Sequence, residues 1–178
     1  MKKLFFILFY LISAPTFAQW KSYYPETNES KKGVKEQNQE KDNFLFNQYL
    51  FNALKAKSLE NFDESLKFFQ KCIKLDDSQA VPFYESAVIN KEHGNFDLAT
   101  EQIKKAVAIE KDNRWFVIAY AEILFSNQDF KNAAIKYKKL IALEPGNEEF
   151  YFMLSDTYIY ANDFEKAIAV YDELEKHK

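Results

Sequence analysis

One short pattern recurs at a constant interval along most of the chain: an asparagine or aspartate followed by phenylalanine, at Phe62, Phe96, Phe130 and Phe164. Each phenylalanine lies 34 residues after the one before it. Carried outward without insertion or deletion, this interval divides the chain into blocks 46–79, 80–113, 114–147 and 148–178. A fixed period of this length is typical of repeat architectures, in which similar units stack on one another.

Each block predicts two amphipathic helices joined by the turn that contains this phenylalanine. Small residues recur on both helices and let them approach closely: Ala53, Ala87, Ala121 and Ser155 on the first, Ser65, Ala99, Ala133 and Ala167 on the second. Larger residues, expected between units, recur as Phe69, Ile103, Tyr137 and Tyr171, and a seam follows at Cys72, Ala106, Leu140 and Leu174. Only 3 glycines and 4 prolines occur, too few for a turn-rich β fold. The expected fold is all-α.

These residues resemble the tetratricopeptide repeat family over all four blocks, about 135 of the 178 residues. The chain departs from the family pattern at Asn52, Ser86 and Tyr120, where leucine is common, and keeps the closing proline only at Pro145. The resemblance implies a right-handed helical-repeat solenoid of four 34-residue helix-turn-helix units over residues 44–178. It also implies that the first helices line a concave groove that binds a segment of a partner protein, and it implies no reaction.

The resemblance places three rows of residues on the groove. They are Leu50, Tyr84, Ile118 and Phe152; Leu54, Val88, Glu122 and Asp156; and Lys57, Lys91, Phe125 and Ile159. The first row favours an apolar partner segment, with packing between neighbouring first helices as the alternative. Lysines in the amino-terminal half and carboxylates in the other half would orient that segment, unless they are simply solvated. The first two rows lack the lysine and asparagine with which family members clamp the carboxylate of a chaperone tail.

The last block predicts a second interaction surface at the carboxyl end. In a stacked array, the first helix of a following repeat would pack against Ile168, Tyr171 and Leu174 of this second helix. These apolar residues are therefore expected to form a docking face, for self-association, for a partner or for further repeats.

The first eighteen residues have the layout of a secretory signal peptide. Two lysines precede an apolar run over residues 4–12, and small residues at Thr16 and Ala18 favour cleavage before Gln19. A membrane anchor is the alternative, but the run is shorter than the roughly 20 residues that a span needs. Cleavage would place the protein in the bacterial periplasm or outside the cell, with no stable membrane span.

Residues 19–43 are polar and mixed in charge, without an apolar period, which predicts a flexible linker. Trp20, Tyr23 and Tyr24 interrupt it. A short docking anchor would explain these aromatic residues, and so would simple tolerance in a mobile tail.

Little in the sequence predicts catalysis, a metal site or a cofactor. The two histidines, His93 and His177, have no second ligand at helical spacing, and Cys72 occupies a small seam position better suited to a buried side chain. A net charge of −3 and a single arginine, Arg114, disfavour nucleic-acid binding. The sequence therefore predicts an exported, non-enzymatic adaptor that binds a protein or peptide. The alternative is a structural solenoid module, the amino-terminal part of a larger envelope assembly.

Overall fold

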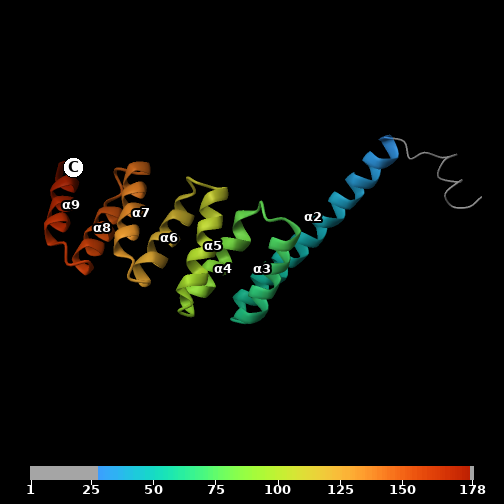
Figure 1. The fold of residues 1–178 in the computed structure, drawn as a ribbon, viewed down its shortest axis with the longest axis horizontal. Coiled ribbons are helices and arrows are strands. Elements are labelled where there is room, and N and C mark those ends of the chain that lie inside the picture. The colour runs from blue at the N-terminus through green and yellow to red at the C-terminus, as the bar shows by residue number, and fades with distance from the viewer. Residues whose placement is uncertain (1–27, 177–178) are drawn as a thin grey trace, which may run out of the picture. The chain divides into compact units, whose positions relative to one another are not determined.

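The computed structural model describes residues 28–176, and the predicted signal peptide and the first part of the linker lie outside them. The chain divides into two units, one that ends at Asp42 and one over Asn43–Lys178. All the regular elements of the described residues are helices (Figure 1). Their bounds are α2 (Asn28–Ser58), α3 (Phe62–Leu75), α4 (Ala80–Glu92), α5 (Phe96–Ile109), α6 (Arg114–Ser126), α7 (Phe130–Leu143), α8 (Glu148–Tyr160) and α9 (Phe164–Lys176). The expectation of an all-α fold is confirmed.

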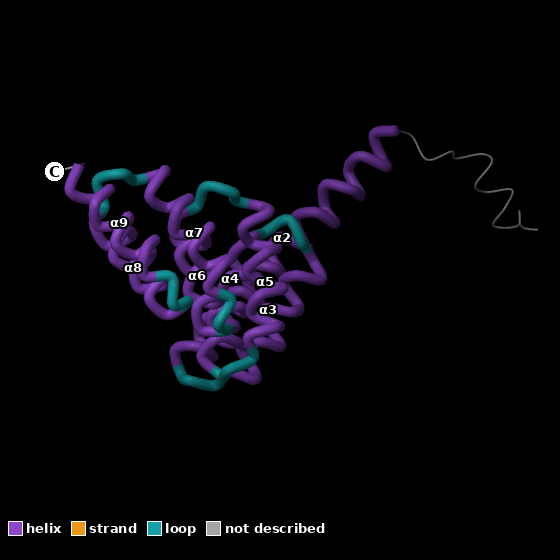
Figure 2. Tube along the Cα trace, turned by 60° about the vertical axis from the view of Figure 1, so that its left-hand side comes forward, coloured by secondary structure: helices purple, strands orange, loops and turns teal. Residues whose placement is uncertain are grey.

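The carboxy-terminal unit is a row of stacked helix pairs. Helices α4, α6 and α8 begin at residues 80, 114 and 148, where the predicted blocks begin. From α3 onward each helix packs against the next one in the chain, and α4 also contacts α6. Figure 2 shows the short loops that join these helices. The last turns of α2 and the whole of α3 form the first pair.

Helix α2 begins earlier than the sequence predicted. Residues 28–43 were expected to be linker, but the helix already starts at Asn28. Lysine, glutamate and glutamine make up most of this stretch, and these residues have high intrinsic helix propensity. The absence of an apolar period therefore excluded a buried face, but not a helix. Among the described residues no helix combines the length and apolar character that a membrane span requires.

The recurrent small residues lie where the two helices of a pair meet. Ala53, Ala87, Ala99 and Ala133 are fully buried. Serine replaces alanine twice, and each hydroxyl bonds across its pair: Ser65 Oγ donates to the Ala53 carbonyl at 2.9 Å, and Ser155 Oγ donates to the Ala167 carbonyl at 3.3 Å. A bulkier side chain at these positions would push the helices apart.

The turn inside each pair repeats its backbone geometry. The residue two positions before the recurrent phenylalanine has a positive φ in all four pairs: 57° at Glu60, 75° at Gly94, 60° at Gln128 and 58° at Asn162. This left-handed conformation ends a first helix. The next residue caps the second helix: the side chains of Asn61, Asp129 and Asp163 each accept a bond from the backbone N–H three residues on. The recurrent Asn/Asp-Phe pattern is thus the start of each second helix.

Most buried side chains form one continuous core from α4 to α9, with Phe116, Ile123 and Tyr151 among its members. A smaller cluster joins the first pair to the second through Ala53, Phe69 and Ile89. The core follows the stacking direction, so each pair is stabilised chiefly by its neighbours.

Candidate partner-binding site

The predicted groove residues share one side of their helices, named here the first-helix face. On each first helix they follow one another at spacings of three or four residues, which keeps them on one stripe of an α-helix. Leu54, Phe152 and Ile159 are 41–43% exposed, and Asp156 is also exposed. The remaining predicted residues are half-buried: Leu50, Tyr84, Val88, Ile118, Glu122 and Phe125.

Part of this face is packing between neighbouring helices. The Tyr84 ring stacks on Phe116 of the next first helix, with centroids 4.8 Å apart, and burial raises the pKa of the Tyr84 phenol. Leu50 packs on the smaller cluster, and Ile118 packs on the main core. The first predicted row is therefore mixed. Phe152 is the member whose ring is most open to solvent.

Three exposed apolar residues of these helices were not among the groove residues predicted from the sequence. Val81 and Trp115 lie one turn before Tyr84 and Ile118, and they are 40% and 58% exposed. Phe51, beside Leu50, is 67% exposed. The helical stripes would have identified Val81 and Trp115, because each stripe extends three residues toward the amino terminus.

The two lysines of the third row are not free to bind a partner. Lys57 Nζ lies 2.6 Å from Glu85 Oε2, and Lys91 Nζ lies 2.6 Å from Glu122 Oε2. Both ion pairs join a first helix to the first helix of the next pair. These lysines therefore bridge neighbouring repeats, and the hypothesis that they orient a bound segment stays a prediction.

An aromatic contact takes over at the third interface. Phe125 on α6 meets Tyr160 on α8 edge to face, with ring centroids 5.1 Å apart. Consecutive first helices are thus linked by one side-chain contact each: an ion pair between α2 and α4, a second ion pair between α4 and α6, and an aromatic ring pair between α6 and α8.

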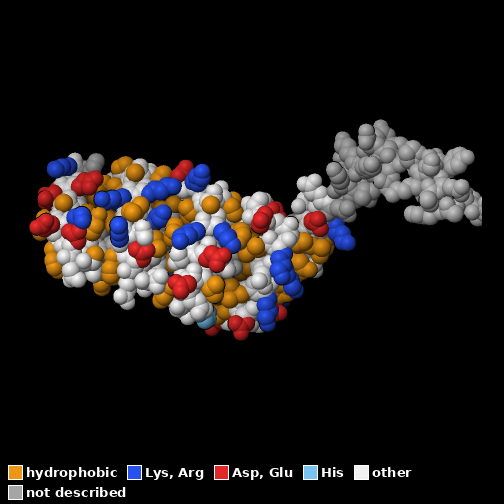
Figure 3. Space-filling model, in the orientation of Figure 1, with side chains coloured by type: hydrophobic (Ala, Val, Ile, Leu, Met, Phe, Trp, Pro, Cys, Tyr) orange, Lys and Arg blue, Asp and Glu red, His pale blue; other side chains and the backbone are white. Residues whose placement is uncertain are grey.

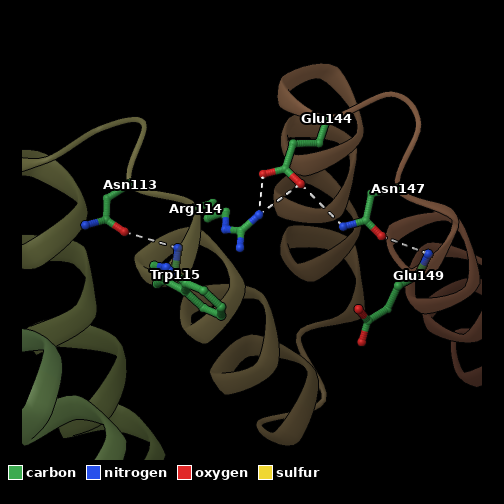
Figure 4. Close-up of polar contacts among 6 residues, drawn as sticks. All are labelled: Asn113, Arg114, Trp115, Glu144, Asn147 and Glu149. Atoms are coloured by element: carbon green, nitrogen blue, oxygen red, sulfur yellow. Dashed lines mark hydrogen bonds and ion pairs between the residues drawn. The ribbon is translucent and has the colours of Figure 1, made fainter.

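The loops at one edge of these repeats form a polar network (Figure 4). Arg114 at the start of α6 donates to Glu144 at 2.9 Å, and this contact lowers the pKa of the Glu144 carboxyl. Asn147 donates to the same carboxylate at 3.4 Å and accepts from the Glu149 N–H at 3.2 Å, which caps α8. The network fixes the first turns of α6 and α8, and so the positions of Trp115 and Glu149.

The predicted carboxy-terminal docking face is only partly exposed. Ile168 is 62% exposed and Tyr171 is 41% exposed. Their counterparts 34 residues earlier, Ala134 and Tyr137, are both 4% exposed because α8 covers them. Leu174, however, is 6% exposed and belongs to the core, so its assignment to the docking face is wrong. Leu174 is already buried within its own repeat, without a following helix.

The surface also has a hollow on the side of the second helices. It has a volume of about 420 Å³, and Ser86 and Asn90 form part of its lining. Tyrosine and leucine occupy the same two positions in the third pair, as Tyr120 and Leu124. The Asn90 amide already donates to the Ser86 carbonyl and to Gln102, so its donors are satisfied inside the protein.

Reactive groups are few on the described surface. Within residues 28–176 no cluster of three or more histidine, cysteine, aspartate or glutamate side chains could hold a metal ion. Cys72 is buried, and burial raises the pKa of its thiol to about 11, so the thiolate form is suppressed at neutral pH. The His93 ring lies at the end of α4, with Nδ1 2.8 Å from the Ile89 carbonyl and Phe62 packed against it. His177 lies outside the described residues.

Comparisons with known proteins agree with this geometry. Two tetratricopeptide repeat models match residues 56–79 and 124–178. No curated protein matches the chain.

Among solved structures, a crystal structure of MamA protein covers 88% of this chain and 85% of its own, with a TM-score of 0.67 and 14% identity. The Arabidopsis OM64 TPR domain covers 63% of this chain and 93% of its own, with a TM-score of 0.57 and 20% identity. The first TPR of Spaghetti (RPAP3), bound to the HSP90 peptide SRMEEVD, covers 66% and 93%, with a TM-score of 0.61 and 19% identity. At these identities the likeness concerns the fold.

Figure 3 shows one side of the molecule, where hydrophobic side chains reach the surface between charged ones.

Proposed function

The chain is a tetratricopeptide repeat protein, and we propose that it is a non-enzymatic adaptor that holds an apolar segment of another protein on its first-helix face. One observation carries the proposal: a large apolar side chain stays exposed on each of the four consecutive first helices, namely Leu54 on α2, Val81 on α4, Trp115 on α6 and Phe152 on α8. Single exposed apolar residues are ordinary, whereas a row of them marks an interaction surface. The peptide bound to the Spaghetti (RPAP3) repeat domain is a precedent for this use of the fold.

We propose further that the adaptor is exported and works in the bacterial periplasm or outside the cell. This part rests on the sequence of residues 1–18 alone. Cleavage would remove two lysines, leaving 22 basic residues against 27 acidic ones and a net charge of −5. Such a charge favours solubility.

A second candidate function is a structural module that stacks through its carboxy-terminal face. The exposure of Ile168 and Tyr171, whose counterparts in the preceding repeat are buried, favours it. On this account the partner would be a second copy, or a further repeat of a larger envelope assembly.

Crosslinking and capture from an envelope extract distinguishes the two functions. We expect one discrete partner, lost from the variant Trp115→Ala/Phe152→Ala and retained by Ile168→Lys. The carboxy-terminal variant leaves Tyr171 unchanged because its ring contacts Phe152, with centroids 6.2 Å apart. Ile135→Ala is a matched control, because Ile135 is 54% exposed but lies on the second helix α7.

Binding and stability should separate in these variants. Removing an aromatic anchor should weaken binding by roughly 1–2 kcal/mol or more. The free energy of unfolding should fall by no more than about 1–2 kcal/mol for Phe152→Ala, because the side chain is only about half buried, and by less for the more exposed Trp115. Loss of the partner from the carboxy-terminal variant alone would favour the structural module.

A further inference from the structure

The first-helix face has a charge imbalance that bears on the chemistry of its partner. Its stripes carry two cations, Lys57 and Lys91, and each is held in an ion pair at 2.6 Å. The side chains of Lys57 and Lys91 retain 31% and 25% exposure, which leaves them little freedom to reach a second anion. No free cation therefore remains on these stripes in the described residues.

Carboxylates, by contrast, stay free at the carboxy-terminal end of the face. Glu149 and Asp156 on α8 are exposed, and neither carboxylate forms an ion pair in the described part of the chain. They lie three residues before and four residues after Phe152, so all three side chains project from the same side of the helix. The carboxylate of Glu122, on the neighbouring first helix, is 39% exposed although it is paired. An acidic partner would meet uncompensated negative charge here.

An aromatic ring lies between these two carboxylates on α8: Phe152 is 43% exposed. The Trp115 ring on α6 is 58% exposed, and the Arg114 guanidinium of the same chain already lies over it, 4.5 Å from the ring centroid. An ammonium or guanidinium group over such a ring gains a cation–π attraction, while its alkyl chain covers apolar surface. The face therefore offers a basic side chain two favourable contacts, a carboxylate and an aromatic ring.

We infer that the partner segment is basic as well as apolar: its apolar residues contact Val81, Trp115 and Phe152, and its lysine or arginine residues contact Glu149 and Asp156 on α8. The inference rests on the proposed function and specifies its ligand. It also separates this face from a surface suited to an acidic peptide such as SRMEEVD, the sequence bound by the Spaghetti (RPAP3) domain. Charge complementarity of this kind chiefly sets the specificity and the association rate of a complex.

Three short peptides test the inference by fluorescence anisotropy with the purified protein. They share the same leucine and phenylalanine positions and carry lysine, glutamine or glutamate at the others. We expect the lysine peptide to bind roughly three- to tenfold tighter than the glutamine peptide, and the glutamate peptide to bind most weakly. The preference for lysine should fall when the salt concentration is raised from 50 to 500 mM, because exposed ion pairs are screened.

Variants assign any preference to this face. Glu149→Gln/Asp156→Asn should bring the lysine and glutamine peptides to within about twofold of each other. Asp77→Asn/Asp97→Asn removes the same net charge from exposed positions outside the face and should leave the preference unchanged. A preference that survives in the first double variant, or that falls equally in both, would overturn the inference and leave the proposed function standing. Failure of all three peptides to bind would count against the proposed function itself.

Discussion

The exposure of one repeated tyrosine position allows a matched test of the stacking order. Tyr137 and Tyr171 occupy the same position in successive repeats, 34 residues apart. Tyr137 is 4% exposed and Tyr171 is 41% exposed, because α8 covers the first and no described residue extends the stack over the second. The same substitution to alanine should therefore cost very different amounts of stability at the two sites.

The burial sets the expected magnitudes. Removing a fully buried aromatic side chain costs about 3–5 kcal/mol, through lost transfer free energy and the cavity left behind. Tyr137→Ala should fall in this range. Tyr171 buries little more than half of its surface and would leave an open dent in place of a closed cavity. Tyr171→Ala should therefore cost about 1–2 kcal/mol.

Urea unfolding followed by circular dichroism measures the loss of unfolding free energy in both variants. In a thermal melt, at roughly 2–4 °C per kcal/mol for a chain of this size, the melting temperature of Tyr137→Ala should fall by about 6–20 °C. Nearest-neighbour coupling should spread that loss to the adjacent repeats. Equal losses at the two positions, or a larger loss at Tyr171, would refute the assignment of the covered and uncovered repeat faces.

Three further predictions follow from burial and from the amino-terminal sequence. Ala133→Leu should destabilise the fold by about 1–3 kcal/mol, because Ala133 is fully buried where two helices meet; a thermal melt that matches the parent would show that the repeat register is wrong. Burial raises the pKa of Cys72 from 9.0 to about 11 and that of Tyr137 from 10.0 to about 12. Ionisation favours the unfolded chain at high pH, so this stabilisation is complete below about pH 9 and is lost as the pH rises through 11 and 12. Urea titrations of Cys72→Ala and Tyr137→Phe should show a shallower alkaline decline than the parent. The exported protein should begin at Gln19, and an intact mass that retains residues 1–18 would contradict export by a cleaved signal peptide.

The helix pairs and their contacts were predictable because one short pattern encodes them four times. A small residue recurs where helices touch, and the turn before Phe62 and its counterparts repeats the same backbone geometry. The burial of Leu174 was harder to foresee, because its position contributes to the core inside its own repeat as well as to the seam with a following one. The early start of α2 was missed for a different reason: a helix that buries no apolar stripe leaves no periodic signal.

The candidate site was predicted less completely than the fold. Its apolar rows follow from helical spacing, but their exposure depends on the neighbouring helix, as the stacking of Tyr84 on Phe116 shows. Sequence separation concealed the ion pairs, since Lys57 and Glu85 are 28 residues apart and meet only when the repeats are stacked. Which charges stay available to a partner is therefore a property of the stack.

Hydrogen exchange of the protein with and without its captured partner tests the central claim most directly. We predict that binding slows exchange in α4, α6 and α8, the helices that carry Val81, Trp115 and Phe152, and leaves α5 and α7 unchanged. Protection confined to α9, around Ile168 and Tyr171, would show that the partner docks on the end of the stack. Protection of α5 and α7 alone would place the binding surface on the opposite side of the repeats and contradict the account.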